Sequence, residues 1–154
     1  MRALLEESPV GPLTLTAEEG FLTGCAFGAF DLGEAGENAA DAAVLALCQQ
    51  EPAAYFAGKL QNFTVPLRPA GTAFRQRVWE ALCRIPYGQT ASYRNIAERV
   101  GNPKAVRAVG GANHHNPIVI LIPCHRVIGS DGSLTGFGGG LEAKKFLLGL
   151  EAGQ

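Results

Sequence analysis

The most informative stretch of the chain is Ile120-Leu121-Ile122-Pro123-Cys124-His125-Arg126-Val127. The apolar residues before Pro123 predict a buried strand, and proline cannot donate a hydrogen bond to a neighbouring strand. The chain is therefore expected to turn at Cys124, where a substrate can reach the thiol. A cysteine taken at random is more often a buried small hydrophobe, so the neighbouring residues must decide between the two interpretations.

Those neighbours favour a reactive thiol. A thiol is mostly protonated at neutral pH, and it becomes a nucleophile beside a base or a positive charge. His125 and Arg126 supply both kinds of group. Adjacent residues of an extended chain point to opposite sides, so His125 would act through the geometry of the turn or through a bridging water. His114 and His115 lack the paired spacing of a zinc site with Cys124, and no metal is expected.

Composition narrows the class of protein. The chain has 154 residues, of which 47% are hydrophobic, and this is enough for a sizeable core. Its four cysteines are scattered without a C-x-x-C pair, which indicates a reducing compartment. The sequence contains neither a signal-peptide core nor an apolar run long enough to cross a membrane, so we expect a cytoplasmic protein without a membrane partner.

The net charge of -1 conceals an uneven distribution. Residues 1–67 carry two basic and nine acidic side chains, whereas residues 68–126 carry nine basic and two acidic ones. A basic block of this kind is a candidate surface for a polyanion, although a solvated helix face is the commoner cause of an arginine cluster.

The first half predicts a small α+β unit. Apolar and polar residues alternate over 13–16 and 21–27 around a turn at 18–20, which indicates a hairpin. A helix is expected over 41–50, followed by a short second helix with Pro52 in its first turn. Three breakers within 63–71 coincide with the change of charge sign, so we expect domains at 1–67 and 68–154.

The second half predicts a mostly helical domain. Thr72 and Ser92 are candidate N-caps of two helices, Asn102-Pro103 is expected to open a third over 104–113, and a last helix is expected over 142–151. Two short helices joined by a tight turn with Gly101 form a helix-turn-helix candidate, a weak indication because any helical hairpin can look the same. The predicted class is therefore α+β, with a sheet-plus-helix domain before a helical domain that holds the cysteine.

The third of these helices has an unusual composition. Small residues cost helix stability, and they are justified where another backbone approaches closely or where helices pack tightly. Lys104 and Arg107 fall about one turn apart on one face, which an apolar core would not favour. The small residues around Arg107 are Ala108, Gly110, Gly111 and Ala112.

The glycine-rich segment 136–141 can lie against a flat ligand or serve as a flexible loop. It matches neither a dinucleotide nor a phosphate-loop fingerprint, and no cofactor is expected.

Taken together, these motifs closely resemble the methylated-DNA-protein-cysteine methyltransferases, also called O6-alkylguanine-DNA alkyltransferases. The resemblance extends from the first hairpin to the last helix. It rests on Thr90-Ala91-Ser92-Tyr93, on Gly101-Asn102-Pro103-Lys104-Ala105-Val106-Arg107-Ala108-Val109-Gly110-Gly111-Ala112, on Asn116-Pro117, on Ile122-Pro123-Cys124-His125-Arg126-Val127 and on Gly139-Gly140-Leu141.

The resemblance implies a chemical role for each matched residue. Cys124 would accept the alkyl group in a single displacement, His125 would take the thiol proton, and Glu151 would orient that histidine. Asn116 would brace the turn and Tyr93 would give a proton to the departing guanine. Carbonyls of Cys124 and Val127 and the N–H of Gly138 would hold the base beside Phe137, at a position where some relatives have tyrosine.

The resemblance also implies a DNA partner. Arg107 would fill the stack left by a flipped O6-alkylguanine, and its small neighbours, with Lys104 and Arg126, would contact the duplex. A monomer acting once per molecule is expected, with O4-alkylthymine as a possible further substrate. Two alternatives stay open: a damage sensor that binds the lesion without transfer, against which Cys124 speaks, and a cysteine hydrolase, which leaves the basic block unexplained.

Overall fold

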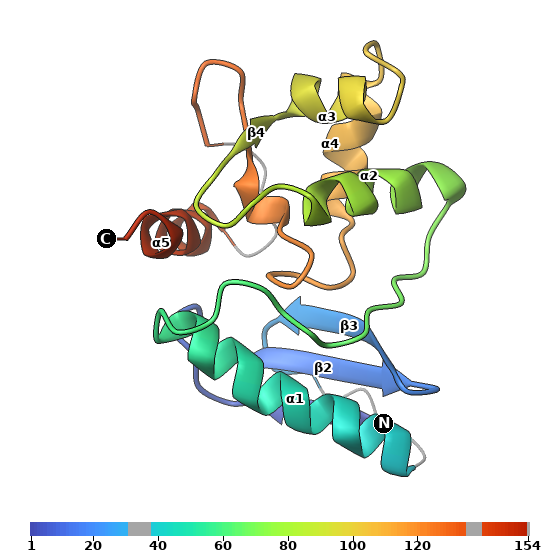
Figure 1. The fold of residues 1–154 in the computed structure, drawn as a ribbon, viewed down its shortest axis with the longest axis vertical. Helices are drawn as coiled ribbons and strands as arrows, with labels where there is room; N and C mark the ends of the chain where they lie inside the picture. The colour runs from blue at the N-terminus through green and yellow to red at the C-terminus, as the bar shows by residue number, and fades with distance from the viewer. Residues whose placement is uncertain (31–37, 135–139, 154) are drawn as a thin grey trace. The chain divides into compact units, whose positions relative to one another are not determined.

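The hairpin expected near the start of the chain is present in the computed structural model, which describes residues 1–30, 38–134 and 140–153. Strand β2 (Leu13–Glu18) pairs antiparallel with β3 (Phe21–Phe27). Glu19 and Gly20 between them have positive φ angles of 51° and 82°, as the tightest hairpin turns require. Strand β1 (Arg2–Leu5), which sequence analysis missed, completes a sheet of order β1-β2-β3 (Figure 1).

Helix α1 (Ala39–Phe56) packs against this sheet. The expectation of two helices was wrong, because Pro52 lies inside one continuous helix. Proline removes one backbone hydrogen bond there. Val44 and Tyr55, on either side of it, are both buried, so packing of the whole helix face outweighs the lost bond.

The outer edge of β3 is covered by two later segments. Leu22 donates its N–H to the Pro66 carbonyl at 2.8 Å. Farther along β3, Cys25 donates to the Pro117 carbonyl at 2.9 Å and accepts from Val119 at 3.0 Å. The first unit therefore comprises Met1–Ala70 together with Pro117–Val119.

The second unit, Gly71–Asn116 with Ile120–Gln154, contains the remaining helices. Thr72 caps α2 (Ala73–Cys83) and Ser92 caps α3 (Tyr93–Arg99), as those side chains predicted. The backbone N–H of Ser92 in turn donates to Oδ1 of Asn95 at 3.0 Å, which completes a capping box. Helix α5 (Leu141–Glu151) lies at the predicted place.

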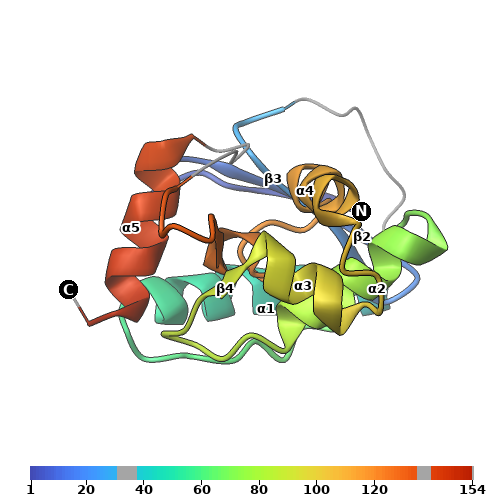
Figure 2. The same ribbon diagram turned by 90° about the horizontal axis from the view of Figure 1, so that it is seen from above.

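The helix-turn-helix pair is present, with α3 followed by α4 (Val106–His114) and Gly101 at φ 83° in the turn (Figures 1 and 2). Helix α4 begins two residues later than expected. Asn102 and Pro103 lie in a turn in which Ala105 donates to the Asn102 carbonyl at 3.0 Å, so this local turn replaces the expected cap.

The predicted strand before Pro123 is the clearest error. Ile120 has φ 72°, a left-handed conformation, and Ile120 and Leu121 lie in a turn. Cys124 begins a short 3-10 helix, η1 (Cys124–Arg126). The strand β5 (Val127–Ile128) follows it and pairs parallel with β4 (Ala91–Ser92). The predicted α+β class is confirmed, and no helix among the described residues is long and apolar enough to cross a membrane.

Candidate active site

Cys124 lies at the start of η1, and its side chain is almost fully covered: the residue is 2% exposed. The preceding turn is held by two asparagines. Asn116 donates from Nδ2 to the Ile122 carbonyl at 2.9 Å, and Asn113 donates from Nδ2 to the Cys124 carbonyl at 3.4 Å. Asn116 was expected to lie at this turn, whereas Asn113 was missed. It occupies the last turn of α4, and nothing in its local sequence distinguishes it from an exposed helix-end asparagine.

His125 follows in the same turn and is completely buried. Its Nε2 lies 2.7 Å from Oε2 of Glu151 in α5. A carboxylate can only accept, so Nε2 carries the hydrogen and Nδ1 keeps its lone pair. Nδ1 has no hydrogen-bond partner among the described atoms, and it can accept a proton.

Glu151 is shared with a second cation. Arg126 donates from Nε to Oε1 at 2.7 Å and from Nη2 to Oε2 at 3.1 Å, and its Nη1 donates to the Ile85 carbonyl at 2.7 Å. Arg126 is 6% exposed. Its expected contact with DNA therefore does not fit the structure, because the carboxylate of Glu151 draws this guanidinium inside.

Burial sets the protonation of the thiol and the imidazole. Desolvation raises the pKa of the Cys124 thiol from 9.0 to about 11. Desolvation also lowers the pKa of His125, although its bond to Glu151 opposes this. The resting pair is thus a protonated thiol beside a neutral imidazole, and thiolate forms only when a base takes the proton.

Lys144 of α5 is a buried cation that sequence analysis missed. It has no exposed surface, and its Nζ donates to the Val127 carbonyl at 2.6 Å. Burial lowers the pKa of Lys144, and its charge lowers that of Cys124. Its spacing could have revealed it, because Lys144 lies on the same helical face as Leu147 and Glu151.

Tyr93 is the first residue of α3 and directly follows β4. The parallel pairing of Ala91 with Val127, and of Ser92 with Ile128, ties this helix start to the segment that follows Cys124. Tyr93 is half-buried. Short backbone pairing thus links two segments that are far apart in the sequence.

Helix α4 presents three of the four small residues, Ala108, Gly110 and Gly111, to open space, whereas Ala112 is buried at 1% exposure. Arg107 and Ala108 are exposed, and Arg107 has no hydrogen bond or ion pair among the described residues. A Cβ added at Gly110 or Gly111 meets no described atom within 4 Å. These glycines are therefore not explained by tight packing in that part of the structure. On its other side α4 is fastened to α2, where Trp79 donates from Nε1 to the Ala112 carbonyl at 2.9 Å.

Lys104 is also exposed, in the turn before α4. Phe137 and Gly138 lie outside the described residues. Within the described ranges, no group of three or more His, Cys, Asp or Glu side chains could hold a metal ion.

Comparison with known proteins relates both parts of the chain to one family. Residues 73–153 match the family model "6-O-methylguanine DNA methyltransferase, DNA binding domain", and residues 1–69 match its "ribonuclease-like domain". The methylated-DNA–protein-cysteine methyltransferase of Methanosarcina acetivorans is 47% identical over 150 residues, 94% of each chain. That of Methanosarcina barkeri is 61% identical over 98 residues, 64% of this chain and 62% of that protein.

Solved structures agree with the sequence matches. A crystal structure of Mycobacterium tuberculosis O6-methylguanine methyltransferase is 44% identical, covering 99% of this chain and 94% of that one with a TM-score of 0.82. Mycobacterium tuberculosis OGT in complex with DNA is 45% identical, covering 99% and 92% of the two chains with a TM-score of 0.85.

Proposed function

Because the chain belongs to the 6-O-methylguanine DNA methyltransferase family, we propose that it transfers the alkyl group of O6-alkylguanine in DNA to Sγ of its own Cys124. The observation that carries the proposal is the imidazole of His125, whose Nε2 is engaged by Glu151 while Nδ1 keeps a lone pair. The free lone pair on Nδ1 supports a role for His125 as the proton acceptor for the buried, protonated thiol of the preceding residue, Cys124.

The proposed reaction is one displacement. Nδ1 of His125 takes the thiol proton, directly or through a water, and the thiolate attacks the alkyl carbon. The S–C bond forms as the C–O6 bond breaks, and its electron pair stays with the guanine. Tyr93 gives a proton to this leaving group and neutralises the charge that would otherwise raise the barrier. Lys144, found from the structure alone, favours the thiolate and orients the Val127 carbonyl.

The product is a thioether, which has no bond that water cleaves at a useful rate. Each molecule therefore acts once. We assign the alkyl transfer and DNA contacts to residues 68–154 and a structural role to residues 1–67. O4-alkylthymine, whose alkyl group is also on an exocyclic oxygen, is a candidate second substrate.

The DNA partner is proposed from α4. The exposed Arg107 follows the family motif, and its side chain would replace the stacking of a flipped base. Ala108, Gly110 and Gly111 would let the duplex backbone approach, with Lys104 neutralising a phosphate. Carbonyls of Cys124 and Val127 would read the base edge together with Gly138 and Phe137. The protein would act as a monomer in the cytoplasm, where its four free thiols would remain reduced.

Intact-protein mass spectrometry tests the transfer. The full chain is mixed with a duplex that contains one O6-methylguanine, and a gain of one methylene mass, about 14 Da, is expected on Cys124. Cys124→Ala should show no gain, whereas Cys83→Ala, which alters an exposed free cysteine, should react like the parent protein. Lesion binding without any mass gain would refute the transfer and favour a damage sensor.

A further inference from the structure

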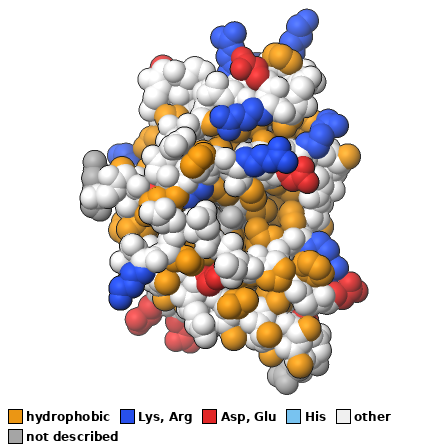
Figure 3. Space-filling view, viewed as in Figure 1, with side chains coloured by type: hydrophobic (Ala, Val, Ile, Leu, Met, Phe, Trp, Pro, Cys, Tyr) orange, Lys and Arg blue, Asp and Glu red, His pale blue; other side chains and the backbone are white. Residues whose placement is uncertain are grey.

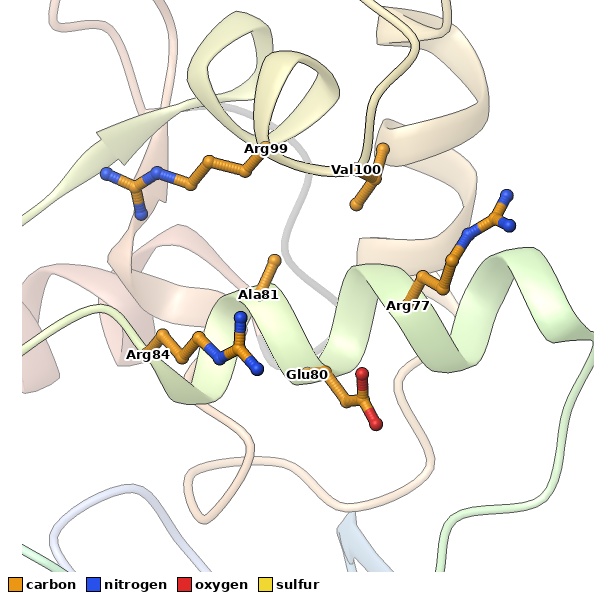
Figure 4. A pocket seen from close by; sticks show the side chains of 6 residues that line it. All are labelled: Arg77, Glu80, Ala81, Arg84, Arg99 and Val100. Atoms are coloured by element: carbon orange, nitrogen blue, oxygen red, sulfur yellow. The ribbon is translucent and has the colours of Figure 1, made fainter.

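A basic pocket lies between α2 and α3, on residues that the proposed reaction does not use. Its volume is about 330 Å³, at the small end of the range for small-molecule sites. The residues that line it are Arg77, Glu80, Ala81, Arg84, Arg99 and Val100 (Figure 4).

The pocket has an apolar floor and a charged rim. Figure 4 shows Ala81 pointing from α2 toward α3 and Val100, with Arg84 and Arg99 on one side of it and Arg77 on the other; the Arg99 side chain extends outward, and that of Arg84 runs along α2 toward Glu80. The space-filling view shows the basic side chains gathered over α2 and α3, around a small patch of hydrophobic atoms (Figure 3). The pocket can thus receive an anion together with an attached apolar or ring-shaped group.

The charges of these arginines are not neutralised within the described part of the chain. Arg77, Arg84 and Arg99 form no ion pair there, and Glu80 is the single acidic side chain on the pocket wall. Arg126, by contrast, is paired with Glu151 at 2.7 Å. The three rim arginines therefore account for a part of the basic block that neither ion pairing nor the proposed α4 surface explains.

We propose that this pocket binds a phosphate group that carries a sugar or a similarly sized substituent. A guanidinium presents a planar fork of donors that matches phosphate oxygens, and Arg84 and Arg99 can approach one phosphate from the two helices. The floor at Ala81 would contact the substituent. The phosphate can come from a DNA backbone or from a free phosphorylated molecule. The inference does not depend on alkyl transfer.

Two double variants of the full chain with the same charge change test this site. Arg84→Gln with Arg99→Gln removes two rim arginines, and Arg75→Gln with Arg94→Gln removes one arginine from each of the same helices outside the pocket lining. Arg84, Arg94 and Arg99 are exposed and Arg75 is half-buried, and Arg94 forms only an exposed ion pair with Glu98, so both proteins should keep the parent's far-ultraviolet circular dichroism. The probe is inorganic pyrophosphate, titrated by calorimetry.

We expect the rim variant to bind pyrophosphate about tenfold or more weakly than the parent, and the control variant to bind like the parent. Undamaged duplex then distinguishes the source. If a DNA phosphate occupies the pocket, the slope of log affinity against log salt falls by about one in the rim variant relative to the control. An equal slope assigns the pocket to a free phosphate compound. Equal pyrophosphate affinities in the two variants would overturn the proposal, whatever the slope.

Discussion

Replacing Glu151 by Gln should lower the free energy of unfolding more than the loss of an exposed carboxylate does. The Glu151 carboxylate is 1% exposed and accepts hydrogen bonds from His125 and Arg126 at 2.7 Å each. The amide of Gln keeps one acceptor oxygen, but it has an NH2 donor in place of the other oxygen. Either His125 or Arg126 would then point its N–H at another donor. Breaking a buried ion pair by removing one partner costs about 3–5 kcal/mol, because the other charge remains buried.

Urea unfolding followed by circular dichroism measures this loss in the free energy of unfolding. The matched control is Glu142→Gln, which changes a carboxylate of the same helix whose side chain is 96% exposed and lies 4.0 Å from its lysine partner. The control should change the unfolding free energy by less than about 0.5 kcal/mol. At the size of this chain, the predicted loss lowers Tm by roughly 10 °C.

A double-mutant cycle that combines Glu151→Gln with Arg126→Met isolates the interaction energy of this pair from the effects of each substitution on its other neighbours. Removing both charges leaves no unpaired ion, so the double variant should lose less than the sum of the two single losses, with a coupling of about 1–3 kcal/mol. Additive losses, or a Glu151→Gln variant as stable as the Glu142→Gln control, would refute the argument that this carboxylate compensates a buried guanidinium.

Three further changes test separate parts of the site. Lys144→Met should raise the pKa of the Cys124 thiol, moving the pH profile of its alkylation by iodoacetamide upward in peptide mass mapping, whereas the exposed Lys145→Met should leave the profile unchanged. Because the pKa of Cys124 is raised to about 11, the protonated thiol stabilises the fold below pH 9, and this contribution falls as pH rises to 11. Between pH 9 and pH 11, the free energy of unfolding measured by urea titration should fall by about 2–3 kcal/mol more in the parent protein than in Cys124→Ala. Parallel plots of unfolding free energy against pH would contradict the raised pKa. Gly110→Ala should raise the free energy of unfolding by about 0.5–1 kcal/mol while weakening duplex binding in a fluorescence anisotropy titration, and unchanged binding would show that no DNA backbone needs that space.

Local signals predicted the starts of α2 and α3 well, but not the continuity of α1 through Pro52 or the start of α4. The hydroxyls of Thr72 and Ser92 form bonds with backbone groups three residues away, so their effect can be read from the sequence. The turn at Ile120 could not be predicted in this way. Isoleucine disfavours a positive φ, and the surrounding apolar run is typical of a strand.

The same contrast between local signals and long-range contacts applies to the residues of the candidate site. The local pattern of residues 120–127 singled out Cys124 and His125, and the family resemblance added Glu151, whose contact with His125 the structure then describes. The burial of Arg126 depends on a carboxylate 25 residues later, and a charge count cannot assign partners at that separation. A count of charges therefore overestimated the surface available to a polyanion.

The pairing of Cys25 with Pro117 and Val119 has a consequence for the synthesis of the protein. A ribosome releases the chain from its N-terminus at about 5–20 residues per second. The N-terminal sheet therefore emerges well before the residues that complete the outer edge of β3. Until Val119 leaves the exit tunnel, that edge retains open backbone donors and acceptors, and a nascent chain stalled before this point should expose an edge prone to association with other strands.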